Sequence, residues 1–251
     1  MTGVVHIDHH SSSVVVLTID NPPMNPLGPD MRAAFMGVLD EVEKSDALRC
    51  IVITGKGRSF CAGDDLKQAH ASGGEDLAGF GRLLERLDQS RVPIVAAING
   101  WCVGGGFELA LCCDIRIAST EAKFTAAGVN MGLMASAYRL PRLIGVSRAK
   151  QILLTGLPTD AVTAEHYGLV TGLHAPEALM PAALELADRL ASRAPLSVEA
   201  TKRVSSRAPD LSPEDAETLQ AKELRVLRRS EDHKEAVAAF NAKRDPVFNR
   251  R

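Results

Sequence analysis

The first two thirds of the chain alternate between short aliphatic runs and segments with apolar residues at helical spacing. The runs are rich in β-branched residues, and three of them end at turns of asparagine, glycine or proline, which is typical of buried strands. The strands expected on this pattern are residues 14–20, 50–54, 94–98 and 114–118. The expected helices are one that opens at Pro29 and those over residues 76–89 and 107–113. This alternation predicts an α/β fold.

The pattern changes at Pro176. Helical patterns then follow one another with no strand between them, over residues 181–192, 197–205, 213–228 and 231–244. We therefore predict a core over residues 1–190 and a helical module over residues 191–251. The small, polar residues 71–76 are expected to be mobile.

Composition argues against several classes of function. A formal net charge of −2 provides no basic field for nucleic acid or an anionic membrane. The sequence contains neither an apolar run of about 18 residues nor a signal-peptide pattern, so we expect no membrane partner. The five cysteines have apolar neighbours and no metal-ligand spacing, which favours buried free thiols in the cytoplasm and no metal site.

Two turns with small residues are the best candidates for chemistry. Gly104-Gly105-Gly106 follows a strand and opens a helix, but it fits neither the GxGxxG nor the GxxxxGK[ST] phosphate motif. The first amides of a helix lack internal partners, and glycines let an oxygen approach them. A tight turn that needs small residues for packing explains the same pattern equally well. A second such turn at residues 59–66 favours the chemical interpretation, because two amides can then serve one oxyanion.

The two turns together resemble the paired motifs of the enoyl-CoA hydratase/isomerase (crotonase) family. The first motif is Phe60-Cys61-Ala62-Gly63-x-Asp65-Leu66. The second is Ile98-Asn99-Gly100 followed by Gly104-Gly105-Gly106-x-Glu108-Leu109-Ala110. The likeness continues through Arg139-Leu140-Pro141-Arg142-Leu143-Ile144-Gly145 and closes with Phe240-x-x-Lys243-Arg244-x-Pro246-x-Phe248. It therefore covers nearly the whole chain.

This resemblance implies a crotonase-like spiral of repeated ββα units that carries an acyl-CoA site, and a C-terminal module that assembles homotrimers or hexamers. It implies that the amides of Asp64 and Gly105 form an oxyanion hole for a thioester carbonyl. The residues that it implies for binding substrate and coenzyme A are Met24, Asn25, Pro26, Ala62, Asp65, Leu66 and Lys243. Lys243 either serves a neighbouring subunit or is a solvated lysine. Coenzyme A enters as part of the substrate, and no separate cofactor is implied.

The catalytic acids depart from the family pattern. Glu108 matches the first of the two glutamates that hydratases of the family use, but the expected position of the second is Gly128. The position near Ser136, which isomerases use, is not acidic either. Tyr138 is a candidate auxiliary donor or else a packing residue. The Asp64 carboxylate would oppose an enolate, so it must point away, be protonated or bind a cationic or polar substrate group.

Three functions remain open on these residues. The first is hydration or double-bond isomerisation of an enoyl-CoA in fatty-acid-type metabolism, with Glu108 as the single acid/base. The second is thioester hydrolysis or decarboxylation, for which Gly128 would open space where an acid normally stands. The third is non-catalytic acyl-CoA binding. The retained glutamate beside a complete oxyanion apparatus favours the first. His70 follows the first motif, but a solvated position on a helix explains it better.

Overall fold

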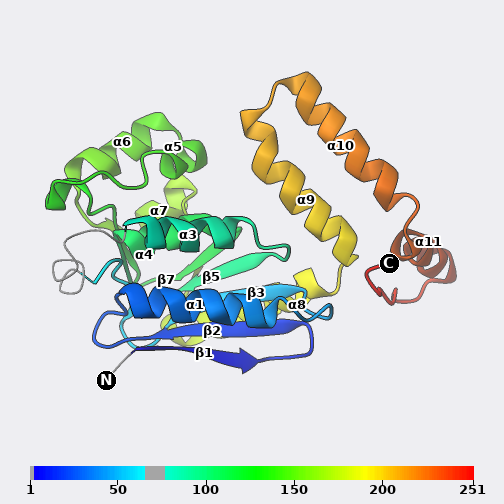
Figure 1. The fold of residues 1–251 in the computed structure, drawn as a ribbon, viewed down its shortest axis with the longest axis horizontal. Coiled ribbons are helices and arrows are strands. Elements are labelled where there is room, and N and C mark those ends of the chain that lie inside the picture. Colours follow the sequence, from blue (N-terminus) through cyan, green and yellow to red (C-terminus); the bar gives the residue numbers. More distant parts are fainter. Residues whose placement is uncertain (1–2, 66–76) are drawn as a thin grey trace.

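The computed structural model describes residues 3–65 and 77–251 and contains two sheets (Figure 1). The larger sheet consists, in spatial order, of β1 (Val4–His9), β2 (Val14–Asp20), β3 (Cys50–Gly55), β5 (Ile94–Ile98), β7 (Ile115–Ser119) and β10 (Leu173–His174). The smaller sheet consists of β4 (Ser59–Cys61), β6 (Trp101–Val103), β8 (Lys123–Thr125) and β9 (Thr159–Asp160). Strand β1 pairs antiparallel with β2, and β9 pairs antiparallel with β8. All other neighbouring strands are parallel.

One unit repeats along the chain. A long strand of the larger sheet runs through a tight turn into a short strand of the smaller sheet, as in β3–β4, β5–β6 and β7–β8. Asn99 holds two such turns together, because its Oδ1 accepts from the Gly55 amide (3.2 Å) and its Nδ2 donates to the Gly57 carbonyl (2.8 Å). Helices follow the first two of these strand pairs. This repetition confirms the predicted spiral of ββα units.

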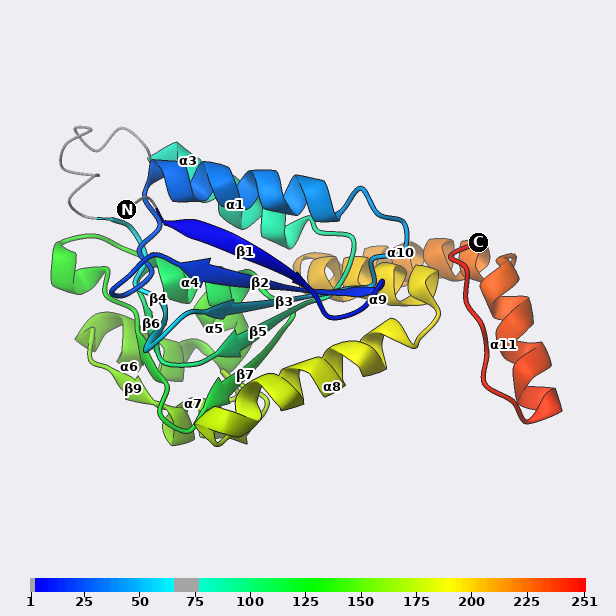
Figure 2. The same ribbon diagram turned by 90° about the horizontal axis from the view of Figure 1, so that it is seen from below.

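Helices cover both faces of the larger sheet (Figure 2). On one face lie α1 (Pro29–Val42), α3 (Leu77–Asp88) and α4 (Gly105–Cys112), and on the other lies α8 (Leu179–Ala191). Side chains alternate between the two cores with a period of two, as the strand pleat requires. Leu17, Ile51 and Ile53 pack in the core of the first face, whereas Val16, Val52 and Val95 pack against α8.

The chain after β8 is mostly helical. Between β8 and β9 lie η1 (Val129–Met131), α5 (Arg139–Ile144) and α6 (Val146–Thr155). Helix α7 (Ala161–Tyr167) lies between β9 and β10. After η2 (Pro176–Ala178) and α8 come α9 (Pro195–Arg207), η3 (Ala208–Asp210), α10 (Pro213–Leu227) and α11 (Glu231–Ala242). The helices α10 and α11 project away from the sheets (Figures 1 and 2). No helix in the ranges 3–65 and 77–251 is long and apolar enough to cross a bilayer.

Polar contacts attach α9 and the C-terminal tail to the core. The Lys202 ammonium on α9 lies 2.8 Å from the Asp114 carboxylate and 2.9 Å from the Val92 carbonyl. Glu199, also on α9, is buried and accepts from Arg91 (3.1 Å) and from Arg250 (2.8 Å) near the C-terminus. Glu199 therefore joins α9 both to Arg91 of the core and to Arg250 of the C-terminal tail, which gives the helical module a fixed connection to the core.

The predicted elements agree with the structure to within a few residues. The strands over 14–20 and 94–98 have the expected bounds, and the four C-terminal helices are present as α8 to α11. The helix expected to start at Phe107 starts at Gly105, so the glycine turn forms its first turn. The division at residues 190 and 191 falls at the end of α8 and stays a prediction. Leu66, His70 and the segment expected to be mobile lie outside the described residues.

We expect Gly106→Ala to destabilise the fold strongly. A Cβ at Gly106 would lie 2.1 Å from the Cys61 carbonyl oxygen, so α4 would have to move away from β4. The expected loss in the free energy of unfolding is about 3 kcal/mol or more, measured by urea denaturation. Gly37→Ala is the matched control, because a Cβ there on α1 has no neighbour within 4 Å, and a gain of about 0.5 kcal/mol is expected. Similar stabilities for the two variants would contradict this packing.

Candidate functional site

Two backbone turns meet at the ends of β4 and β6. A Cβ built on Gly63 would lie 2.5 Å from the amide nitrogen of Gly105 and 3.0 Å from the carbonyl oxygen of Val103. The Gly63 Cα must therefore lie within about 4 Å of the Gly105 nitrogen, given standard bond lengths. Gly63 also has a φ of +86°. This position therefore requires glycine for two reasons, the lack of room for a Cβ and the left-handed backbone. The structure thus brings together the two turns that the sequence motifs single out.

The amides of Asp64 and Gly105 are available to a ligand. In the part of the chain that the structure describes, neither amide donates to a protein acceptor, and both residues are partly exposed. The Gly105 amide belongs to the first turn of α4, where N–H groups have no partner within the helix. Two adjacent free amides beside a helix N-terminus are suited to bind an oxygen that gains negative charge.

Residues 24–27 hold the first turn in place. The Met24 carbonyl accepts from the Ala62 amide (3.0 Å), and the Leu27 amide donates to the Gly63 carbonyl (2.7 Å). Pro26 and Gly63 form an isolated parallel bridge between these bonds. Met24, Pro26, Ala62 and Asp65, which the resemblance implies for coenzyme A binding, are all partly exposed. They therefore lie together on an accessible part of this turn.

Asn25 differs from its neighbours because its side chain is 1% exposed. Its Nδ2 donates to the carbonyls of Lys56 (3.0 Å) and Ser59 (2.7 Å), and its Oδ1 accepts from the Asn21 amide (2.9 Å). These bonds tie the β3–β4 turn to the segment that supports Gly63. The Asn25 side chain thus shapes the site from inside, and the residues that present surface to a ligand are those on either side of it.

The Asp64 carboxylate is neutralised by α1. Its Oδ1 forms an ion pair with Nη1 of Arg32, whose side chain is buried and also donates to the Leu27 carbonyl (2.8 Å). The Arg32 guanidinium lies 5.7 Å from the centroid of the Phe80 ring, and that ring packs over Gly105. The carboxylate is therefore paired with a cation that the protein itself supplies. Sequence reasoning missed Arg32, although a basic residue within the apolar pattern of this helix was its signal.

Glu108 lies three residues after Gly105 on α4 and is largely buried, with 13% of its side chain exposed. The Ser136 amide donates to its Oε1, and Nη1 of Arg139 lies 3.8 Å from its Oε2. Arg139 is itself held by an ion pair with Asp88 on α3. The carboxylate therefore has a defined orientation close to the turn that carries the free amides. The sequence analysis marked the position near Ser136 as lacking an acid and included Arg139 in the family likeness, but it did not predict that either residue contacts Glu108.

Gly128 borders an open pocket, but backbone lies in the direction that a side chain at residue 128 would take. A Cβ on Gly128 would lie 2.8 Å from the Ala135 amide nitrogen and 3.1 Å from the Leu133 carbonyl oxygen. The backbone of residues 133–135 runs across this position, because the loop between Gly132 and Arg139 is short. An acid at residue 128 is thus missing from the sequence and excluded by the backbone.

An apolar pocket of about 400 Å³ lies behind this loop. The residues that line it on the loop side are Ala126, Gly128, Val129, Met134, Ala135 and Ala137. Helices α5 and α6 supply the remaining lining, which is Pro141, Val146, Lys150, Leu153 and Leu154. The pocket therefore adjoins the residues on either side of Ser136 and has the volume and apolar surface for a hydrocarbon group.

The Tyr138 side chain has partners other than Glu108, and Lys243 lies far from Glu108 within one chain. The Tyr138 hydroxyl lies 3.3 Å from the Asp210 carboxylate, and its ring stacks under Arg142 at 5.0 Å. Lys243 caps the C-terminal end of α11 in the left-handed conformation, and α11 lies at the opposite end of the molecule from α4 (Figures 1 and 2). Within one chain it is remote from the site, so a role there requires a second subunit.

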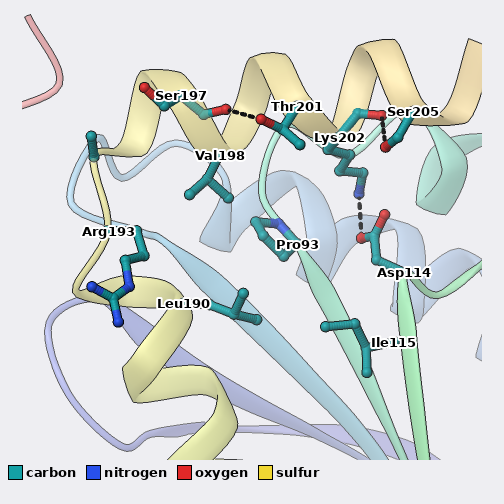
Figure 3. A pocket seen from close by; sticks show the side chains of 11 residues that line it. Pro93, Asp114, Ile115, Leu190, Arg193, Ser197, Val198, Thr201, Lys202 and Ser205 are labelled. Atoms are coloured by element: carbon teal, nitrogen blue, oxygen red, sulfur yellow. Dashed lines mark hydrogen bonds and ion pairs between the residues drawn. The ribbon is translucent and has the colours of Figure 1, made fainter. Parts of the chain in front are cut away.

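A second pocket, of about 340 Å³, lies where β5 and β7 begin, at the other end of the strands from Gly105 (Figure 3). It separates these strands from α9 and contains the ion pair between Lys202 and Asp114. The Asp114 carboxylate also accepts from the Ile94 amide (2.7 Å). The polar groups of this pocket therefore serve to attach α9.

Comparison with known proteins agrees with the motifs. Residues 9–251 match the family model described as enoyl-CoA hydratase/isomerase. The chain is 38% identical to the (E)-benzylidenesuccinyl-CoA hydratase of Thauera aromatica, over 95% of this chain and 96% of that protein. It is 33% identical to the crotonyl-CoA hydratase of Syntrophomonas wolfei, over 94% of each. A crystal structure of an enoyl-CoA hydratase from Bacillus anthracis superposes with a TM-score of 0.95 at 29% identity, over 98% of this chain and 99% of that one.

The thiols around the site are expected to be unreactive in the folded protein. All five cysteines are buried and free. Burial raises the pKa of Cys61, next to the Gly63 turn, to about 12, and that of Cys113 to about 12. Ellman's reagent at pH 8 should therefore label no thiol in the native state and five after unfolding in guanidinium chloride.

The same pKa shifts predict a loss of stability in alkali. An unfolded thiol ionises near pH 9, whereas the folded thiols stay protonated up to about pH 12. The stabilisation is therefore complete below pH 9 and decreases as the pH rises toward 12. Rapid labelling of the native protein at pH 8 would contradict both expectations.

Proposed function

The chain belongs to the enoyl-CoA hydratase/isomerase family, and we propose that it adds water to the double bond of an α,β-unsaturated acyl-CoA. The observation that supports this most directly is the contact between the Gly63 and Gly105 turns, which leaves two free amides near the Glu108 carboxylate. Isomerisation of the double bond is the related alternative, since it needs the same groups. Hydration is preferred because both relatives compared above are hydratases by name.

In this proposal the amides of Asp64 and Gly105 bind the thioester carbonyl oxygen. Hydrogen bonds from both would polarise the conjugated system and stabilise the enolate that forms when the β-carbon is attacked. Each such donor typically contributes about 3 kcal/mol to transition-state stabilisation. The Arg32 ion pair matters here, because an uncompensated Asp64 carboxylate beside the hole would oppose the enolate.

Glu108 would move the proton. One carboxylate can take a proton from water as the oxygen attacks the β-carbon, and can then return that proton to the α-carbon. Each carboxylate oxygen has more than one acceptor site, so the bond from the Ser136 amide leaves capacity for this transfer. Arg139, fixed by Asp88, would keep the carboxylate from rotating out of reach.

The substrate would be held in two places. Met24, Pro26, Ala62, Asp65 and Leu66 would contact coenzyme A, with Asn25 as their buried support, and no separate cofactor would be needed. The 400 Å³ apolar pocket next to Gly128 would receive the acyl group. Fatty-acid-type metabolism in the cytoplasm is the setting that we propose.

The remaining alternatives have no support from the site. Thioester hydrolysis or decarboxylation is motivated only by the absence of an acid at residue 128, where backbone of residues 133–135 takes the position of a side chain. A protein that only binds acyl-CoA would not need the contacts with Ser136 and Arg139 that orient Glu108.

We also propose that the chain assembles as a homotrimer or hexamer. Large apolar side chains are exposed on the helical region after β8, where Met134 is 82% exposed, and on the projecting helices, where Phe240 is 84% exposed. Burial of such surfaces between copies is the usual way to remove them from water. Assembly would also give Lys243 a route to the coenzyme A site of a neighbouring subunit.

The role of Glu108 is tested by Glu108→Gln, which keeps the size of the side chain but cannot accept a proton. With crotonyl-CoA as substrate, loss of the conjugated thioester absorbance should slow by at least about 100-fold, while KM changes little. Glu121→Gln, a change on the exposed turn after β7, is the control and should behave as wild type. Release of free thiol or carbon dioxide is followed in parallel. Equal rates for wild type and Glu108→Gln would exclude the proposed role.

The assembly is tested by Phe240→Asp on α11. Loss of one buried aromatic side chain per contact weakens association by about 2 kcal/mol or more. Light scattering after gel filtration should show three or six chain masses for wild type and smaller, concentration-dependent species for the variant. Lys234→Glu, also exposed on α11, is the matched control and should keep the wild-type mass. A monomeric wild type would defeat this part of the proposal.

A further inference from the structure

Ser136 combines three unusual features at one position. Its φ is +59°, a left-handed value that serine rarely adopts. Its amide donates to Glu108, as described above. Its hydroxyl is buried and has no hydrogen-bond partner within residues 3–65 and 77–251. Strained backbone conformations and unpaired buried polar groups are both concentrated at functional sites.

The location of Ser136 gives these features a common explanation. The residue is 4% exposed, and its neighbours Ala135 and Ala137 line the apolar pocket. Ser136 thus contacts Glu108 through its amide, while the residues on either side of it border the space that would receive the acyl group. The same loop takes the position of a side chain at Gly128, so the described polar residues beside the single glutamate are Ser136 and Arg139, and of these only Ser136 is uncharged.

We propose that Ser136 takes over the task of a second catalytic acid without adding a second charge. Its amide orients Glu108, and its hydroxyl holds the water that adds to the β-carbon. This inference rests on the proposed function and deepens it. A hydroxyl suits the task because it can donate one hydrogen bond and accept another, whereas a second carboxylate would repel Glu108.

The step balances with these groups alone. Water, hydrogen-bonded to the Ser136 hydroxyl, transfers one proton to Glu108 while its oxygen forms a bond to the β-carbon. The electron pair of the double bond moves toward the thioester and forms the enolate held by the two amides. Glu108 then returns the proton to the α-carbon, and the net change is the addition of one water molecule. The serine exchanges no proton in the cycle, so it is a positioning residue.

Two substitutions separate the hydroxyl from the backbone. Ser136→Gly removes the hydroxyl, relieves the left-handed strain and keeps the amide. Ser136→Ala removes the hydroxyl and keeps the Cβ and its strain. If the hydroxyl holds water, both variants should lose about tenfold or more in the rate of crotonyl-CoA hydration. Thermal unfolding verifies that both are folded, and Ser119→Ala, at another buried serine, is the matched control that should keep full activity.

A second readout excludes a purely structural effect. Exchange of the α-proton of butyryl-CoA for deuterium in D₂O needs Glu108 and the amides but no added water at the β-carbon. We expect this exchange to stay within about twofold of wild type in both Ser136 variants, while hydration falls.

Three outcomes would overturn the inference. Full hydration activity in Ser136→Gly would show that the hydroxyl has no part, and a parallel fall in exchange and hydration would show that Ser136 acts through Glu108 alone. A wild type that is inert in both assays would remove the proposed function, and this inference with it.

Discussion

The site depends on close contact between two stretches of backbone. The turn at residues 61–64 touches the start of α4 without an intervening side chain, at Gly63 against the Gly105 amide and at Gly106 against the Cys61 carbonyl. Two strands of the smaller sheet and one helix must approach so closely that only glycine fits. Because this contact is made by main-chain atoms, the surrounding side chains can vary while the position of the amides is kept.

Charge around this contact is balanced locally. Arg32 reaches from α1 to Asp64, and Arg139 lies between Asp88 on α3 and Glu108 on α4. A chain with a net charge of −2 offers no general attraction for an anionic ligand, so these local pairs determine the field at the site. The pairs of Arg139 also connect α5, where it lies, to α3 and α4.

Much of the fold could be predicted because its strands are aliphatic and end at turns. The pattern does not reveal β1, in which His6 and Asp8 interrupt the apolar residues, or the three-residue strands β4, β6 and β8, which are too short to show a period. The two motifs located the turns and Glu108. They did not locate Ser136 or Arg32, whose importance depends on contacts between segments far apart in sequence, and they gave no sign that the loop would close over Gly128.

The loop over Gly128 also limits which substitutions this corner of the site can accept. Glutamate at this position and a loop of this length are incompatible, because the main chain passes through the volume that the side chain would need. Engineering that introduces an acid at residue 128 therefore has to rebuild the loop of residues 133–135 as well.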